Sequence, residues 1–195
     1  MLATDYSPQS DEYLVEGIKN GDIAAFDELY GRYNHRLFHF FYRMFNKDSE
    51  KAEDFLQDLF LKLIEKPHLF DGSKRFSTWF YAIAQNMCKN EYRRLSIRLS
   101  KQPQIDEMLY NADKICLPDI ENRIDGTLFL QMLNEEIEQL DEIKRGTFLL
   151  RYQENFSIKE IADIMQCSEG TVKSRIFYTI QKLADKLKIF APQNK

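Results

Sequence analysis

A cluster of basic, hydroxyl and aromatic side chains near the C-terminus has the chemistry needed to bind double-stranded DNA. The cluster comprises Thr171, Lys173, Ser174, Arg175, Phe177 and Tyr178. In a helix these side chains lie on or beside the side opposite an apolar stripe, where they can face base edges and phosphates in a major groove. A merely solvated surface would favour mixed Glu and Lys, whereas the acidic residue here is Glu169, at the helix start.

Two short helices joined by a tight turn are predicted to position this cluster. Ser157 and Glu160 form a capping box for the first helix, and Ser168 can cap the second. The buried stripe predicted for the second helix consists of Val172, Ile176, Ile180, Leu183 and Leu187. The pattern indicates a helix-turn-helix, although two amphipathic helices joined by any short turn give a similar periodicity.

A second group of side chains suits the binding of unpaired bases. The segment 76–94 is predicted to be helical, with Phe80, Ile83, Ala84 and Met87 in its core stripe. A second face carries Trp79, Ala82, Asn86, Asn90 and Arg93, with Phe76 above it and Lys89 and Arg94 beside it. Aromatic rings can stack bases while amides and cations hold a phosphate backbone. A buried Trp79 at the start of a merely basic helix is an equally good interpretation of the residues alone.

A third group lies on one face of the helix predicted over residues 50–66. Asp54, Gln57, Asp58, Leu61 and Glu65 share this face, and the opposite face carries Ala52, Phe55, Leu56, Leu59, Leu63 and Ile64. Taken alone, the first face is most simply a solvated acidic surface. An exposed Leu among carboxylates, in a chain with two basic segments, favours a docking face for a basic partner.

The charge of the chain is distributed in blocks. The net charge of −4 divides into −6 over residues 1–65, +6 over 66–101, −4 over 102–126, −3 over 127–155 and +3 over 156–195. Two basic segments separated by acidic ones indicate two anion-facing surfaces on one chain, with acidic surface left for other partners.

The elements that must carry these groups are predicted to be helices in two small domains. Further helices are expected over residues 12–20, 22–45, 127–140 and 144–153, from apolar spacing and capping residues. Residues 96–126 contain Pro103 and Pro118 and lack a sustained period, so they are expected to form a flexible linker with a transient helical turn near 105–110. The predicted fold class is all-α.

Several function classes find no support in the sequence. Cys88, Cys116 and Cys167 are isolated, which argues against disulfides and a zinc site. His35 and His39 lie four apart without a third ligand nearby, so surface histidines are expected rather than a metal site. No paired nucleophile and base and no phosphate-binding Gly loop is visible. We expect no catalysis, no cofactor and no metal, and neither a signal peptide nor a membrane span.

Three segments of the chain, in order, resemble the extracytoplasmic-function (ECF) group of bacterial sigma factors, the dissociable subunits that give RNA polymerase its promoter specificity. They are 52–60 (AEDFLQDLF), 70–86 (FDGSKRFSTWFYAIAQN) and 170–177 (GTVKSRIF). The resemblance implies sigma region 2 at residues 12–95, an acidic linker at 96–126 and sigma region 4 at 127–190. Three ordered matches are more specific than any one of them.

The resemblance also implies roles for individual residues. Those implied to bind core polymerase are Asp54, Gln57, Asp58, Phe60 and Leu61. Those implied to bind the melted −10 element are Phe70, Lys74, Arg75, Phe76, Trp79, Asn86, Lys89, Asn90, Arg93 and Arg94. Thr171, Lys173, Ser174, Arg175, Phe177 and Tyr178 are implied to bind the −35 duplex.

The implied partners are core RNA polymerase, promoter DNA and an anti-sigma factor. The protein is then expected to be a cytoplasmic monomer that associates with the nucleoid when active and can be held at the membrane by the anti-sigma factor, without inserting itself. Asp141, Asn155 and Tyr178 depart from the family's usual Pro, Gly and basic residue at these places. The alternative of a stand-alone helix-turn-helix regulator leaves the faces around Asp58 and Trp79 unexplained.

Overall fold

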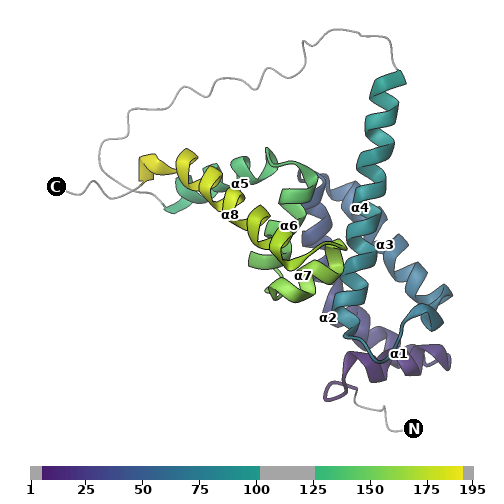
Figure 1. Cartoon of the computed structure of the whole chain (residues 1–195). Helices are drawn as coiled ribbons and strands as arrows, with labels where there is room; N and C mark the ends of the chain where they lie inside the picture. Colours follow the sequence, from purple (N-terminus) through teal and green to yellow (C-terminus); the bar gives the residue numbers. More distant parts are fainter. Residues whose placement is uncertain (1–5, 102–125, 191–195) are drawn as a thin grey trace.

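The computed structural model describes residues 6–101 and 126–190, in which all regular secondary structure is helical (Figure 1). The α-helices are α1 (Asp11–Lys19), α2 (Ile23–Met44), α3 (Ser49–Glu65), α4 (Phe76–Lys101), α5 (Gly126–Glu138), α6 (Glu142–Tyr152), α7 (Ile158–Met165) and α8 (Glu169–Lys186). Two 3₁₀ turns, η1 (Pro67–Leu69) and η3 (Lys188–Phe190), complete the described part. The predicted all-α class is confirmed.

Side-chain caps fix where most of these helices begin, because the first backbone N–H groups of a helix lack partners within it. Asp22, Asp141 and Ser168 accept hydrogen bonds from the first turns of α2, α6 and α8. Ser157 and Glu160 form the predicted capping box of α7. Gly21 and Asn155 adopt positive φ angles of 81° and 60° between helices, which Gly and Asn tolerate. These sequence signals correctly placed the turns.

Helices α1 to α4 form the N-terminal domain around a core rich in aromatic rings. Tyr33 of α2 meets the edges of Phe76 and Phe80 of α4 at centroid distances of 5.4 and 5.9 Å. Phe60 of α3 meets Phe80 at 5.4 Å. Edge-to-face contacts of this kind add to the stabilisation that burial of the rings supplies. They fix the orientation of α4 relative to α2 and α3.

Two positions predicted to face inward are wrong. Ile64 of α3 is 50% exposed, and Ile180 of α8 is 39% exposed, whereas the side chain of Thr179 is buried. In α8 the buried stripe runs through Val172, Ile176, Thr179 and Leu183. A helix with 3.6 residues per turn carries position 180 to the edge of that stripe. The hydrophobic character of Ile therefore misled the assignment.

Helices α5 to α8 form the C-terminal domain, which packs directly on the N-terminal one. Figure 1 shows α7 lying beside α4, and the buried apolar side chains of α6 and α7 belong to the same continuous core cluster as those of α2 and α4. Helix α4 is longer than predicted and reaches Lys101, where a linker was expected from residue 96. Cys116 and the helical turn predicted near 105–110 lie outside the described residues.

Candidate nucleic-acid interface

One face of α3 presents acidic and apolar side chains together to solvent. Asp54, Gln57 and Asp58 are exposed, Leu61 is 51% exposed, and the exposed Ile64 extends the apolar part. Large aliphatic side chains exposed beside carboxylates mark a surface that is suited to bind a protein with basic and apolar groups.

Phe60, predicted from the family resemblance to contact the polymerase, is instead buried. The residue is only 4% exposed, and its ring packs against Phe26, Tyr30 and Phe80 at centroid distances of 6.0, 4.8 and 5.4 Å. The residue lies on the core side of α3, beside Leu59 and Leu63. Phe60 therefore supports the helix from beneath and does not face a partner.

A groove of about 500 Å³ runs between α2 and α3 next to this face. Its lining includes Tyr30, His35, His39 and Gln57. The two histidine rings stack at a centroid distance of 6.3 Å. Within the described residues, no group of three His, Cys, Asp or Glu side chains is placed to hold a metal ion.

The loop before α4 is a tight turn that presents two cations. Asp71 accepts hydrogen bonds from the N–H and hydroxyl of Ser73 at 3.0 and 2.8 Å. The backbone N–H of Ser73 is the main reason that the pKa of Asp71 lies below its usual value. Lys74 and Arg75 follow this turn and are exposed, as an anion-binding loop requires.

Phe70 and Phe76, both predicted from the family resemblance to contact melted DNA, are buried in the structure at 3% and 0% exposure. Their rings lie 5.6 Å apart, and the half-buried Trp79 packs on both, at 5.2 and 5.8 Å. Burial of an aromatic ring in a core is strongly favourable, so these two rings stabilise the domain and are not available to contact DNA. Of these three rings, only Trp79 keeps partial access to solvent.

Glu12 of α1 fixes the start of α4. Its carboxylate accepts a hydrogen bond of 2.9 Å from the backbone N–H of Phe76, one of the donors that a helix start leaves unpaired. Burial raises the pKa of Glu12, but hydrogen bonds, led by that from the Phe76 N–H, outweigh it and leave the pKa below its usual value. This contact joins residues 64 apart in the chain, so local sequence patterns carry no signal for it.

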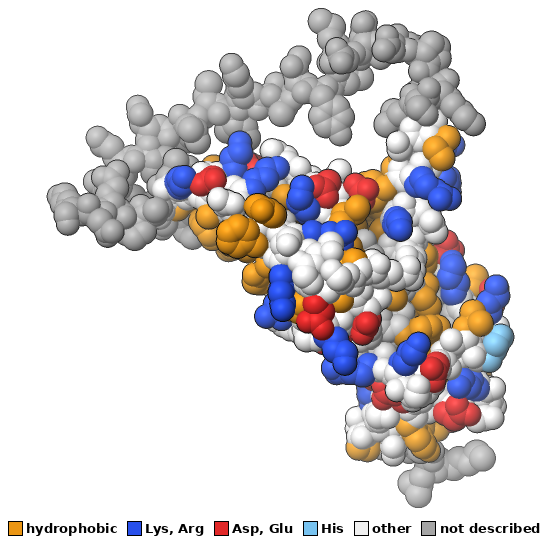
Figure 2. Space-filling model, in the orientation of Figure 1, with side chains coloured by type: hydrophobic (Ala, Val, Ile, Leu, Met, Phe, Trp, Pro, Cys, Tyr) orange, Lys and Arg blue, Asp and Glu red, His pale blue; other side chains and the backbone are white. Residues whose placement is uncertain are grey.

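Basic side chains follow the outer part of α4. Lys89, Asn90, Arg93 and Arg94 are exposed, and Asn86 is half-buried. Figure 2 shows Lys and Arg side chains gathered on the projecting end of this helix. Glu91 is an acidic residue within this basic stretch. Its carboxylate forms an ion pair with Lys51 of α3 at 2.8 Å and lies 3.5 Å from the guanidinium of Arg94.

Helix α8 carries the predicted duplex-binding residues, and most of them reach solvent. Phe177 and Tyr178 are 63% and 62% exposed, and Lys173 and Ser174 are exposed beside them. Arg175 is half-buried, with its guanidinium 3.5 Å from the sulfur of Cys167. Figure 2 shows hydrophobic and basic side chains side by side along this helix.

Two hydroxyl groups of this set are partly committed to the helix itself. The Ser174 hydroxyl donates to the carbonyl of Gly170 at 3.0 Å, and Thr171 Oγ1 lies 2.9 Å from the hydroxyl of the capping Ser168. Beside them a cleft of about 510 Å³ is lined by residues of α6, α7 and α8, including Tyr152, Lys173 and Phe177. All six residues predicted to bind the duplex lie on α8.

Sequence reasoning missed the polar residues that join the two domains. Glu154, which follows α6, receives hydrogen bonds from Tyr81 Oη at 2.5 Å and Arg36 Nε at 3.1 Å. Arg145 of α6 donates to the carbonyl of Met44 at 2.8 Å. Local periodicity carries no information about partners so far away in the chain, so these roles had no sequence signal.

Comparison with known proteins identifies the family. Residues 29–97 match the family model Sigma-70 region 2, and residues 130–183 match Sigma-70, region 4. The RNA polymerase sigma-H factor of Pseudomonas aeruginosa is 35% identical over 176 residues, which cover 87% of this chain and 89% of that protein. The ECF RNA polymerase sigma-E factor of Escherichia coli K12 is 32% identical over 185 residues, covering 91% and 94%.

The chain therefore belongs to the sigma-70 family and is an RNA polymerase sigma factor of the ECF type. The family resemblance expected from the three motifs is confirmed. None of the helices in the described ranges, 6–101 and 126–190, combines the length and hydrophobicity that crossing a membrane requires.

Solved structures share the fold. CnrH, in complex with the cytosolic domain of CnrY, matches with a TM-score of 0.67 and 22% identity, covering 93% of this chain and 99% of that one. The sigma factor RpoE, in complex with the anti-sigma factor NepR from Bartonella quintana, matches with a TM-score of 0.60 and 24% identity, covering 80% and 91%.

Proposed function

We propose that this sigma factor uses three separate surfaces: α3 to bind core polymerase, the start and outer part of α4 to bind the melted −10 strand, and α8 to bind the −35 duplex. The observation that carries the proposal is that the residues in each set, apart from the buried Phe60, Phe70 and Phe76, are at least partly accessible. The first set lies on α3, the second on α4 and the turn before it, and the third on α8. Their chemistry differs as the three partners require.

On α3 the contact surface consists of Asp54, Gln57, Asp58 and Leu61, with the exposed Ile64 added. Carboxylates here would pair with basic groups of the polymerase, and the aliphatic side chains would bury apolar area at the same interface. Phe60 holds the helix in place through its contacts with Tyr30 and Phe80.

At the −10 element the half-buried Trp79 offers part of a supported ring, and Asn86 offers an amide on the same face of α4, about two turns further along. Lys74 and Arg75 of the turn, with Lys89, Asn90, Arg93 and Arg94 of α4, would hold phosphates of the unpaired strand. Phe70 and Phe76 act from below, because they pack under the Trp79 ring.

On α8, Lys173 and the half-buried Arg175 would contact phosphates or guanine edges, and the exposed Phe177 and Tyr178 would make apolar contacts in the groove. Thr171 and Ser174 add hydroxyl groups near the helix start. Tyr178 replaces the expected basic residue, which favours apolar or hydroxyl contact at that base step.

The protein acts without catalysis of its own, in the cytoplasm, and is regulated by an anti-sigma factor that can tether it to the membrane. The two structural matches support such a partner, because RpoE is bound there to the anti-sigma factor NepR and CnrH to the cytosolic domain of CnrY.

Charge reversal of Asp58 tests the assignment of α3. Asp58→Lys should weaken retention of core polymerase by at least about tenfold, because it places a cation against a basic surface, while leaving binding to a −35 duplex unchanged. Glu16→Lys is the matched control, since Glu16 is an exposed carboxylate on α1 that pairs with Lys19. Equal retention of polymerase by both variants would refute the assignment.

A further inference from the structure

The face of α4 turned toward the C-terminal domain is closely packed. The ring of Tyr81 meets Phe156 at a centroid distance of 5.0 Å, and both side chains are buried. Gly146 of α6 lies so close to α4 that a Cβ atom added there would be 2.7 Å from Oε1 of Gln85. A side chain at residue 146 would therefore have to displace the amide end of Gln85, which is itself buried.

Buried polar contacts hold this arrangement. The carboxylate of Glu154 is 2% exposed and pairs with Arg36 at 3.0 Å, in addition to its hydrogen bond from Tyr81. Arg145, 4% exposed, donates to Met44 O and to Asn46 Oδ1 in the N-terminal domain, at 2.8 and 2.6 Å. Charged groups that are buried in this way are costly unless they are paired, so these contacts specify one relative position of the domains.

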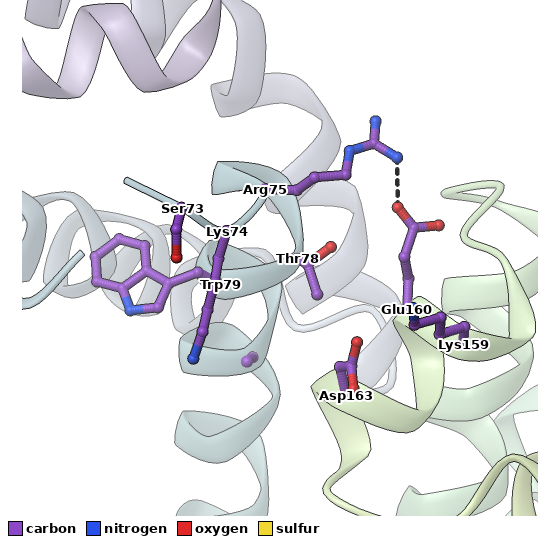
Figure 3. Close-up of a pocket in the computed structure, with 9 residues that line it drawn as sticks. Ser73, Lys74, Arg75, Thr78, Trp79, Lys159, Glu160 and Asp163 are labelled. Atoms are coloured by element: carbon purple, nitrogen blue, oxygen red, sulfur yellow. Dashed lines mark hydrogen bonds and ion pairs between the residues drawn. The ribbon is translucent and has the colours of Figure 1, made fainter. Parts of the chain in front are cut away.

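The same arrangement brings acidic groups of α7 to the −10 side of α4. A cleft of about 650 Å³ is lined by Lys74, Arg75, Thr78 and Trp79 from one domain and by Lys159, Glu160 and Asp163 from the other. Figure 3 shows Arg75 and Glu160 pointing toward each other across this cleft, and their charged groups are 2.5 Å apart. A phosphate bound by Arg75 would have to displace that carboxylate.

Two polar atoms of α4 are buried without partners in the part of the chain that the structure describes. The hydroxyl oxygen of Thr78 and Oε1 of Gln85 are buried and accept or donate no hydrogen bond within the described residues. A buried polar group without a partner opposes the buried state. Gln85 faces Gly146 of the other domain and Thr78 lines the cleft between the domains, so opening would release both groups to water.

We propose that the free chain is self-masked: α7 docks on the −10 side of α4, and the carboxylates of Glu160 and Asp163 occupy the place of strand phosphates until the two domains separate. The proposal rests on the proposed −10 role of α4. Single-stranded DNA and α7 then compete for one surface.

A larger side chain at residue 146, placed between the two domains, tests the proposal in the full-length chain. Gly146→Leu introduces a side chain that collides with Gln85 and does not change the charge. Gly31→Leu is the matched control, because a Cβ at Gly31 of α2 meets no atom within 4 Å. Both replace a helical Gly with a better helix former, so helix propensity acts alike in the two variants.

Two quantities are measured for each variant: the radius of gyration by small-angle X-ray scattering, and the affinity for a short thymine-rich single-stranded oligonucleotide by fluorescence anisotropy. Gly146→Leu should be more expanded than Gly31→Leu and bind about tenfold more tightly, as expected if roughly nine-tenths of the wild-type chains are closed. Asn86→Ala in the Gly146→Leu background should remove the gain.

A second variant, which changes charge and not packing, tests the proposal if Gly146→Leu fails to fold. Glu160→Gln with Asp163→Asn keeps the capping box, because Gln also serves at that position, and should bind the oligonucleotide several-fold more tightly. Glu169→Gln with Asp185→Asn also removes two negative charges, but from α8, and should give a smaller gain in affinity for the oligonucleotide. Equal gains in the two double variants would mean that net charge alone is responsible and would overturn the proposal.

Two further results would overturn the proposal: a wild-type chain as expanded as Gly146→Leu, or an expanded Gly146→Leu that binds the oligonucleotide no better than Gly31→Leu. Failure of the proposed function would look different. In that case wild-type protein mixed with core polymerase would produce no promoter-specific transcript, whatever residue stands at position 146.

Discussion

Arg145 shows how one side chain can organise several elements. Its guanidinium donates to the backbone carbonyls of Ile137, Glu138 and Leu140 at the end of α5 and to Met44 O at the end of α2. Helix ends leave carbonyl groups without partners, and Arg satisfies several of them through its fork of donors. A buried cation is stabilising at this place because acceptors surround it.

Arg145→Lys should therefore lower the free energy of unfolding by about 3 kcal/mol, because an ammonium group has fewer donors and leaves buried carbonyls unpaired. Denaturation by urea, followed by circular dichroism, measures this loss. Arg151→Lys is the control, since Arg151 donates to the carbonyl of Phe156 at 2.9 Å from a less buried position. Equal, small losses in both variants would contradict the role given to Arg145.

Glu12 gives a prediction about pH. Its folded pKa lies below the usual value of 4.5, so the charged form is favoured in the folded state. The resulting stabilisation is fully present above about pH 4.5 and is lost as the pH falls through the folded pKa. Glu12→Gln should destabilise the protein at neutral pH and do so less at about pH 3.5. A difference from wild type that grows on acidification, measured by urea denaturation, would contradict this assignment.

Among the elements, α8 depends on its first turn. Ser168 accepts a hydrogen bond of 3.1 Å from the N–H of Thr171, which orders the part of the helix that would meet DNA. Ser168→Ala should cost about 1 kcal/mol of stability, and Ser168→Asp should restore the cap. The Asp variant should still bind a −35 duplex less tightly than wild type, because its charge repels phosphates. Thermal denaturation and duplex titration separate these effects; full binding by Ser168→Asp would place the helix start away from DNA.

The interior of α8 contains a second test. The hydroxyl group of Thr179 is buried without a hydrogen-bond partner in the described part of the chain, so its desolvation is uncompensated. Thr179→Val keeps the shape and should raise the free energy of unfolding by about 1 kcal/mol. A loss of stability in urea denaturation would show that the hydroxyl group has a partner.

At the scale of elements the sequence predicted the fold well. Caps and turn residues such as Asp22, Ser157 and Ser168 act on their nearest neighbours, so local patterns locate helix starts. Burial of individual side chains was harder to predict. An aromatic ring can either pack in the core or contact a partner, and only the tertiary arrangement decides between these outcomes. The structure buries the rings of Phe60, Phe70 and Phe76.

For the whole molecule, the relative position of the two domains had no sequence signal. It depends on Gly146 facing Gln85 and on Glu154 meeting Arg36 and Tyr81, and each pair joins residues far apart in the chain. The three proposed binding surfaces are separate in the sequence but lie on two domains in direct contact, and α7 borders the cleft beside α4. This arrangement makes domain separation part of the proposed mechanism.

Mapping of transcript starts in a reconstituted reaction tests the central claim most directly. Core RNA polymerase with this protein should initiate at defined sites that share two upstream elements, whereas core alone should not. Asp58→Lys should abolish these transcripts, and Glu16→Lys should not. Identical transcripts from core polymerase with and without the protein would contradict its assignment as a promoter-specificity subunit.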